Sequence, residues 1–151
     1  MDIHEVVATV QRRKEQEAVR NELELRAAKQ KDAVFEDLRR NLQAELNRQV
    51  AAFKQQGITL YINAQERDTV VVNRDDSAKT LTISFAAIFH QVAFNYDGGA
   101  VFKRSLTVES ETRSGLLGSR EQFYYRRENN TVVQPQEIPS FVTEVLKILL
   151  V

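Results

Sequence analysis

The chain has 151 residues, of which 42% are hydrophobic and 28% are charged, as in one ordinary globular domain. Its 21 basic and 21 acidic residues give a net charge of zero, which removes the overall attraction on which non-specific nucleic-acid binding depends. Cysteine is absent and only two histidines are present, so a disulfide framework, a thiolate nucleophile and a multi-histidine metal site within the chain are excluded.

The two ends of the chain predict a cytoplasmic protein without a membrane segment. The N-terminus carries acidic residues early and lacks the apolar stretch of a secretory signal. The longest strongly apolar run, Val145 to Val151, is interrupted by Lys147 and is too short to span a bilayer. The lack of cysteine also suits a reducing compartment.

Residues 1–56 predict one long helical region. They contain neither proline nor glycine and are dense in alanine, leucine, glutamate, glutamine, lysine and arginine, which are good helix formers. Gly57 follows where the helical pattern stops, as expected just past a helix C-cap. The second half has apolar residues at steps of three and four, which predicts that it docks on a core: Phe35, Leu38, Leu42, Leu46, Val50 and Phe53. The first half has a thinner and interrupted set: Ile3, Val6, Val7, Val10, Val19 and Leu23.

The length of this helix is its most informative property. Residues 2–56 would form a helix roughly 80 Å long, whereas the rest of the chain would form a globule about 30–35 Å across. In a single domain spanning 1–151, we expect residues 1–31 to project or bind a partner and residues 32–151 to form a helix–sheet–helix core. Alternatively, the helix is kinked or broken near residues 29–32, where Asp32 could cap a second helix that folds back.

After Gly57 the apolar period changes to two, which predicts about six to seven strands. Well-marked turns and short spacings favour an antiparallel meander that forms a curved sheet. The candidate strands are 58–63, 69–74, 79–85, 92–96, 101–109, 122–128 and 131–134.

Residues 85–95 allow two interpretations. Leu81, Ile83 and Phe85 share one parity, whereas Val92 and Phe94 share the other, so a continuous strand would need a bulge near residues 86–87. Apolar residues also recur there at helical spacing. The bulged strand is favoured because both flanks are rich in strand formers.

The C-terminal segment predicts a short buried helix. Pro135 and Pro139 stand just ahead of it, as at a helix start. Its wide apolar stripe predicts a helix that packs on the sheet: Phe141, Val142, Val145, Leu146, Ile148 and Leu149. The predicted fold is therefore α+β, with a long N-terminal helix, a curved antiparallel sheet and a short C-terminal helix.

No sequence motif predicts an enzyme, a cofactor or a metal site. The chain lacks the glycine-rich phosphate loops, the nucleophile elbow and the paired-histidine zinc motif. An enzyme without a recognisable motif is therefore the third and least favoured reading.

Several residues could contact a ligand or an anion. His90 is interpreted first as a core or core-edge histidine bonded to the backbone, and otherwise as a ligand contact. Basic residues interleave with aromatic ones around Phe123–Arg127, a pattern found on anion-binding surfaces, although ordinary sheet packing is favoured. Residues 110–120, with two leucines between Gly115 and Gly118, are predicted to be a long loop that either binds a ligand or covers the core. The candidate contacts are His90, Lys103, Arg104, Arg113, Arg120, Tyr124 and Arg126.

These features predict a non-enzymatic interaction or assembly module that self-associates through its N-terminal helix. A homodimer is favoured, nucleic acid is an unlikely partner, and the identity of any protein partner stays open. The alternative is a small-ligand or anion-binding protein that uses the concave face of the sheet and the 110–120 loop.

Overall fold

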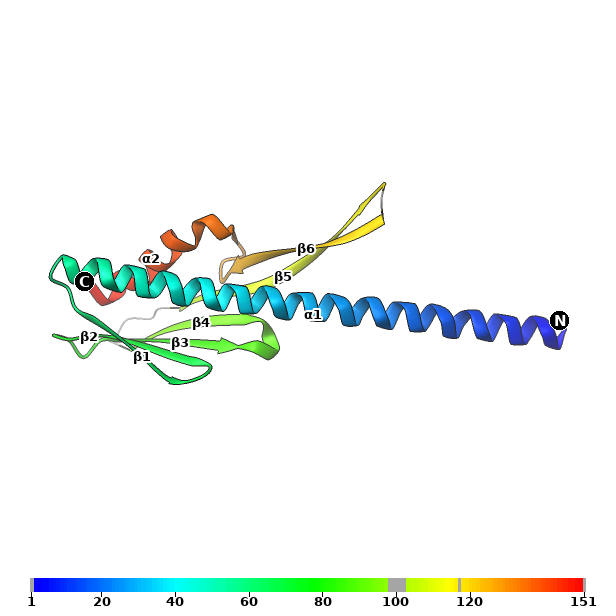
Figure 1. Cartoon of the computed structure of the whole chain (residues 1–151), viewed down its shortest axis with the longest axis horizontal. Coiled ribbons are helices and arrows are strands. Elements are labelled where there is room, and N and C mark those ends of the chain that lie inside the picture. The colour runs from blue at the N-terminus through cyan, green and yellow to red at the C-terminus, as the bar shows by residue number, and fades with distance from the viewer. Residues whose placement is uncertain (1, 98–102, 117, 151) are drawn as a thin grey trace.

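The computed structural model describes residues 2–97, 103–116 and 118–150. A long helix α1 and a short helix α2 pack against one curved antiparallel sheet, as predicted (Figure 1). The helices are α1 (Ile3–Gln55) and α2 (Ile138–Leu150). The strands pair in chain order: β1 (Leu60–Glu66), β2 (Thr69–Arg74), β3 (Thr80–Ala86), β4 (Gln91–Asp97), β5 (Lys103–Gly115), β6 (Gly118–Arg127) and β7 (Val132–Val133).

Helix α1 is continuous over 53 residues, so the break considered near residues 29–32 does not occur. No proline or glycine interrupts the backbone hydrogen bonds of this segment. Asp2 caps the start by accepting a hydrogen bond from the His4 backbone N–H at 3.3 Å. Gly57 follows the end with φ of 85°, a conformation that glycine adopts without a Cβ penalty. Asp32 lies inside the helix and caps nothing.

The core lies between the sheet and the second half of α1, with α2 packed beside α1. The predicted stripe of α1 supplies Phe35, Leu38, Leu42 and Leu46, each at most 2% exposed. Alternate residues of the strands point to the same layer, as the burial of β3 shows. Of the residues predicted for the apolar stripe of α2, Ile148 is only partly buried and the others are buried: Phe141, Val142, Val145, Leu146 and Leu149.

Two polar side chains fix α2 in place. The buried Gln49 amide donates to the Pro139 carbonyl at 2.8 Å, and its oxygen accepts from the Thr143 hydroxyl at 2.9 Å. The Arg74 guanidinium donates to the carbonyls of Leu149 and Leu150. The two bonds from Arg74 satisfy carbonyls at the end of α2 that lack partners within the helix.

Residues 85–95 form a hairpin corner, so the favoured bulged strand is wrong, as is the helix. Strands β3 and β4 are joined by a short 3₁₀ turn, Ala87–Phe89, and by His90 in the left-handed conformation with φ of 49°. The chain reverses there, and Phe85 pairs with Val92 on the core face. The change of parity in the sequence therefore marks a turn between paired strands.

Residues 110–120 are not a loop either, because they extend the hairpin of β5 and β6. The strands pair without interruption from Leu106 and Arg127 to Gly115 and Gly118. We call residues 110–115 with 118–122 the arm; it projects away from the rest of the sheet (Figure 1). Leu116 at its tip is fully exposed and covers no core, while Leu117 lies outside the described residues.

Candidate functional site: the projecting segment of helix α1

The seven residues predicted to contact a ligand do not converge on one site. Lys103 and Arg113 stand on β5 about 34 Å apart along the strand. Arg113 lies opposite Arg120 in the arm, and Tyr124 lies opposite Glu109 farther down the hairpin. Arg104 and His90 lie elsewhere, as described below.

His90 joins the corner between β3 and β4 to α1. Its Nε2 atom lies 2.6 Å from Oδ1 of Asp32, and its ring meets the Phe35 ring edge to face at 6.0 Å. The expected position at the core edge is correct, but the expected backbone partner is replaced by a carboxylate. This carboxylate, Asp32, lies 58 positions away in the sequence, so no local pattern indicates the contact. These contacts give His90 a structural role.

Arg104 belongs to an ionic cluster beside α2. Its Nε lies 3.4 Å from a carboxylate oxygen of Glu128 and 3.4 Å from one of Glu144. Arg127 donates to Glu144 at 3.0 Å and lies over the Phe141 ring. The hydrogen bond from Arg127 lowers the pKa of Glu144, and the same bond raises the pKa of Arg127. Opposite charges are thus matched within the cluster.

Arg126 is likewise paired with a carboxylate, on the other face of the sheet. It donates to Glu109 at 2.7 Å and to Asn130 at 2.6 Å. The face of the sheet toward the helices is filled by core side chains. Arg104, Arg126 and Arg127 are therefore each paired with a carboxylate.

The largest feature left without a packing explanation is the first half of α1, residues 3–31, which we call the projecting segment. It extends far beyond the sheet (Figure 1). None of its residues is buried, and the first buried residue of the helix is Phe35. It nevertheless carries apolar side chains exposed by 43–74%: Ile3, Val6, Val7, Val10, Val19, Leu23 and Leu25.

The charges of the projecting segment alternate in blocks along its length. Glu5, together with the capping residue Asp2 just before the segment, forms an acidic block at the start. A basic block at residues 12–14, a mainly acidic block at 15–24 and a basic block at 26–31 follow. The ion pairs of Arg20 with Glu24 and of Glu22 with Arg26 lie at i,i+4 and are solvent-exposed. Each contributes only about 0.3–0.5 kcal/mol, so they do not replace a packed face.

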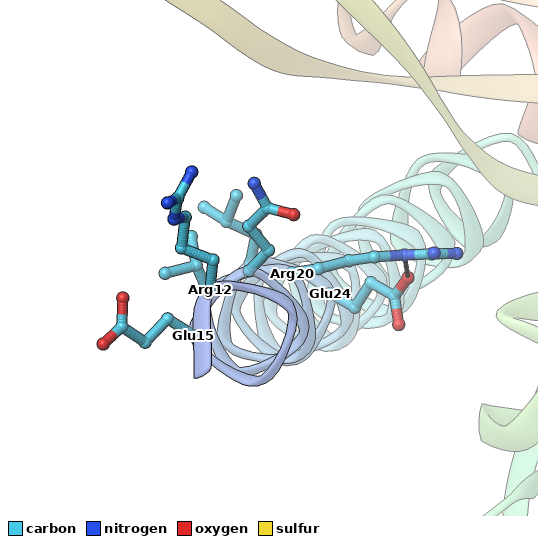
Figure 2. A pocket seen from close by; sticks show the side chains of 7 residues that line it. Arg12, Glu15, Arg20 and Glu24 are labelled. Atoms are coloured by element: carbon cyan, nitrogen blue, oxygen red, sulfur yellow. Dashed lines mark hydrogen bonds and ion pairs between the residues drawn. The ribbon is translucent and has the colours of Figure 1, made fainter. Parts of the chain in front are cut away.

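A groove lies where the arm runs beside the projecting segment. It has a volume of about 580 Å³ and its walls come from both elements: Leu23, Arg26, Ala27, Gln30, Thr112, Arg120 and Glu121. A second hollow, of about 490 Å³, surrounds Val19 and Leu23 on α1 alone. Figure 2 shows its labelled side chains spreading from one helix, with Arg20 paired to Glu24. The second hollow is therefore an open helix surface and not a cavity.

The comparisons with known proteins give no assignment. No family model, curated protein or solved structure matches this chain. Among the described residues, no group of three or more histidine, aspartate or glutamate side chains could hold a metal ion. No helix in the described ranges is long and apolar enough to cross a membrane.

Proposed function

We propose that this chain is a non-enzymatic assembly module that forms a homodimer through the projecting segment of α1. The carrying observation is a helical stretch of nearly thirty residues, none of them buried, that exposes seven large apolar side chains. An isolated helix of this kind is only marginally stable in water, so packing against another chain supports it.

The composition of the projecting segment favours another copy of the chain as its binding partner. Its acidic and basic blocks are similar in size, so the segment can be electrostatically complementary to itself. A membrane-surface helix would instead carry a strongly basic polar face. The balanced charge of the whole chain likewise gives no general attraction to nucleic acid.

Light scattering after size exclusion tests the proposal on the full chain. We expect twice the chain mass of 17.3 kDa at micromolar concentration. Val7→Glu with Val10→Glu should give the monomer mass, because two charges would enter the apolar surface. Thr9→Glu, which adds a charge on another side of the helix from Val7 and Val10, is the control and should leave the dimer intact. A monomeric unmodified chain would remove the proposal.

The arm supports a second candidate, the binding of an anion. Arg113 and Arg120 lie directly opposite each other, an arrangement of like charges that is unfavourable without a counter-charge. Glu111 is 3.9 Å from Arg113 and both side chains are largely exposed. Titration with inorganic phosphate, compared between the full chain and Arg113→Gln with Arg120→Gln, tests whether the two arginines hold an anion.

A further inference from the structure

One line of residues on the projecting segment continues directly into the buried stripe of α1. Its members alternate at steps of four and three, the spacing of a coiled-coil heptad. The same spacing leads on to Phe35, Leu38 and Leu42, which are buried. We call this line the seam: Ile3, Val7, Val10, Lys14, Glu17, Asn21, Glu24, Ala28 and Lys31.

The charges in the seam decide between the two orientations of a helix pair. In a parallel pair in register, each seam residue faces its own copy, so Lys14 would face lysine and Glu17 would face glutamate. Glu24 and Lys31 would also meet like charges. Like charges at facing positions destabilise the pair.

An antiparallel pair avoids these contacts: those of Lys14 and Glu17 are replaced by attractive ones, while Glu24 faces Val7 of the partner subunit. If facing residue numbers add up to 31, Lys14 faces Glu17 of the partner subunit on both sides of the two-fold axis. We infer that two chains pair along the seam in this antiparallel register, an inference that rests on the dimer proposed above. The overlap from Ile3 to Ala28 would be about 39 Å long.

Residues beside the seam fit the same register. Asp2 stands level with Lys29 of the partner subunit, and Glu5 with Arg26 of the partner subunit. Val6 stands level with Leu25 of the partner subunit, so exposed apolar side chains also meet. No two residues of like charge stand level with each other over residues 2–29. Electrostatic matching of this kind fixes orientation and register more than it adds affinity.

The polar residues of the seam favour one register of the helix pair over the others. A lysine or an asparagine in a coiled-coil core position specifies orientation and register at some loss of stability. Here Asn21 faces Val10 of the partner subunit, while Lys14 and Glu17 occupy the centre. The result is a reversible dimer with one preferred alignment.

The inferred register also brings the partner to an exposed apolar surface of the globule. The partner's Ile3 lies level with Ala28, one helical turn before Asp32, the residue bonded to His90. The corner that carries His90 also exposes Ile88 by 88% and Phe89 by 72%. A hollow of about 320 Å³ lies between that corner and α1, lined by Asp32, Phe35, Glu36, Ala87 and Ile88. The seam therefore ends next to apolar side chains that otherwise face water.

Disulfide trapping tests the orientation, because the natural chain has no cysteine. Full-length Val10→Cys and Asn21→Cys chains are oxidised separately and as an equimolar mixture, then resolved without reductant. The register predicts a covalent dimer in the mixture and little in either chain alone. In that register, two copies of position 10 are about 16 Å apart along the axis, beyond the reach of a disulfide.

The possible results separate the orientation from the self-association. Efficient cross-linking of Val10→Cys with itself would overturn the antiparallel register and leave the dimer proposal standing. A dimer by light scattering that cross-links in no combination would also overturn the register. A monomeric unmodified chain would overturn the dimer itself, and the inference with it.

A charge exchange gives an independent check on Lys14 and Glu17. Lys14→Glu and Glu17→Lys should each raise the dimer dissociation constant roughly tenfold, since each puts two like-charge contacts at the centre. The double variant Lys14→Glu with Glu17→Lys should recover most of the affinity. Failure of the double variant to recover would contradict the predicted contact, provided that the strand signal in circular dichroism shows that each variant keeps its sheet.

Discussion

Charged and polar side chains link the elements of this fold at their junctions. Arg39, only 7% exposed, lies over the Phe85 ring at 4.9 Å and donates to the Arg67 carbonyl at 3.0 Å and to Asp68 at 3.2 Å. It thereby joins α1 to the turn between β1 and β2. A buried guanidinium is tolerated here because its charge and most of its donors have partners.

Glu144 links stability to pH. Its pKa lies below the ordinary carboxyl value, first because Arg127 donates a hydrogen bond to the carboxylate. A carboxylate with a lowered folded-state pKa stabilises the fold above its unfolded pKa of about 4.3, and this contribution is lost as the pH falls through the folded value.

We therefore expect Glu144→Gln to lower the free energy of unfolding at pH 7 by no more than about 1 kcal/mol, because the side chain is 41% exposed. The variant should also lose less stability than the parent between pH 5 and strongly acid conditions. Urea unfolding at several pH values measures both effects. Glu66→Gln, at an exposed carboxylate on β1, is the control; an unchanged acid dependence in Glu144→Gln would contradict the assignment.

Leu146 and Leu149 test the burial of α2. Both are fully buried in the core. Truncating each to alanine should lower the free energy of unfolding by about 2–5 kcal/mol, since the lost transfer energy and the new cavity add. Denaturant unfolding beside the parent measures the change. Lys147→Ala, at an exposed position of the same helix, should change stability by less than about 0.5 kcal/mol.

At the level of elements, α1 divides into two parts that differ in how they are packed. Residues from Phe35 onward contact the sheet and α2, whereas residues 3–31 contain no buried side chain. Helix stability in proteins comes mainly from such packing and less from intrinsic propensity. One continuous helix can therefore have a stable half and a half whose stability depends on a partner.

We expect deletion of residues 2–28 to leave the sheet and the core intact while it removes dimerisation. Far-ultraviolet circular dichroism should keep its strand signal, and light scattering should report a monomer. Replacing Phe35 and Leu38 by alanine in the full chain should instead cost several kcal/mol, because both are core residues. Unfolding of the truncated chain would show that the projecting segment belongs to the core.

At the level of the whole molecule, the proposed dimer should control how much of α1 is helical. The projecting segment accounts for about two fifths of all helical residues, and alone it is marginal. Dilution below the dissociation constant should therefore reduce the helical circular dichroism signal while the sheet signal persists. Added salt should weaken the dimer, since its charge contacts are solvent-exposed.

The Val7→Glu and Val10→Glu chain provides the reference for this measurement. It should show the reduced helical signal at every concentration, because we expect it to stay monomeric. If the helical signal of the parent is independent of concentration down to the nanomolar range while its mass falls, the segment is stable alone and pairing is not what maintains it.

The local sequence determined the elements whose signals are local. The absence of proline and glycine over residues 1–56 predicted α1, and Gly57 marked its end. Period-two alternation predicted the strands, and the stripe of residues 141–149 predicted α2. These signals could be read because helix and strand periodicities depend on neighbours within a few residues.

The tertiary structure alone decided which distant residues meet. The sequence allowed Asp32 to cap a second helix, whereas in the structure it lies inside α1 and contacts His90, 58 positions away. The sequence also allowed a bulge at 86–91, whereas in the structure the chain turns there and β3 pairs with β4. The sequence suggested that the basic residues form one surface, but the pairing of the strands places Arg104 beside Glu144 and Arg126 beside Glu109. The uninterrupted helix past residue 31 likewise left its first half uncovered. Contacts of this kind depend on register and chain reversal, which side-chain patterns along one segment do not encode.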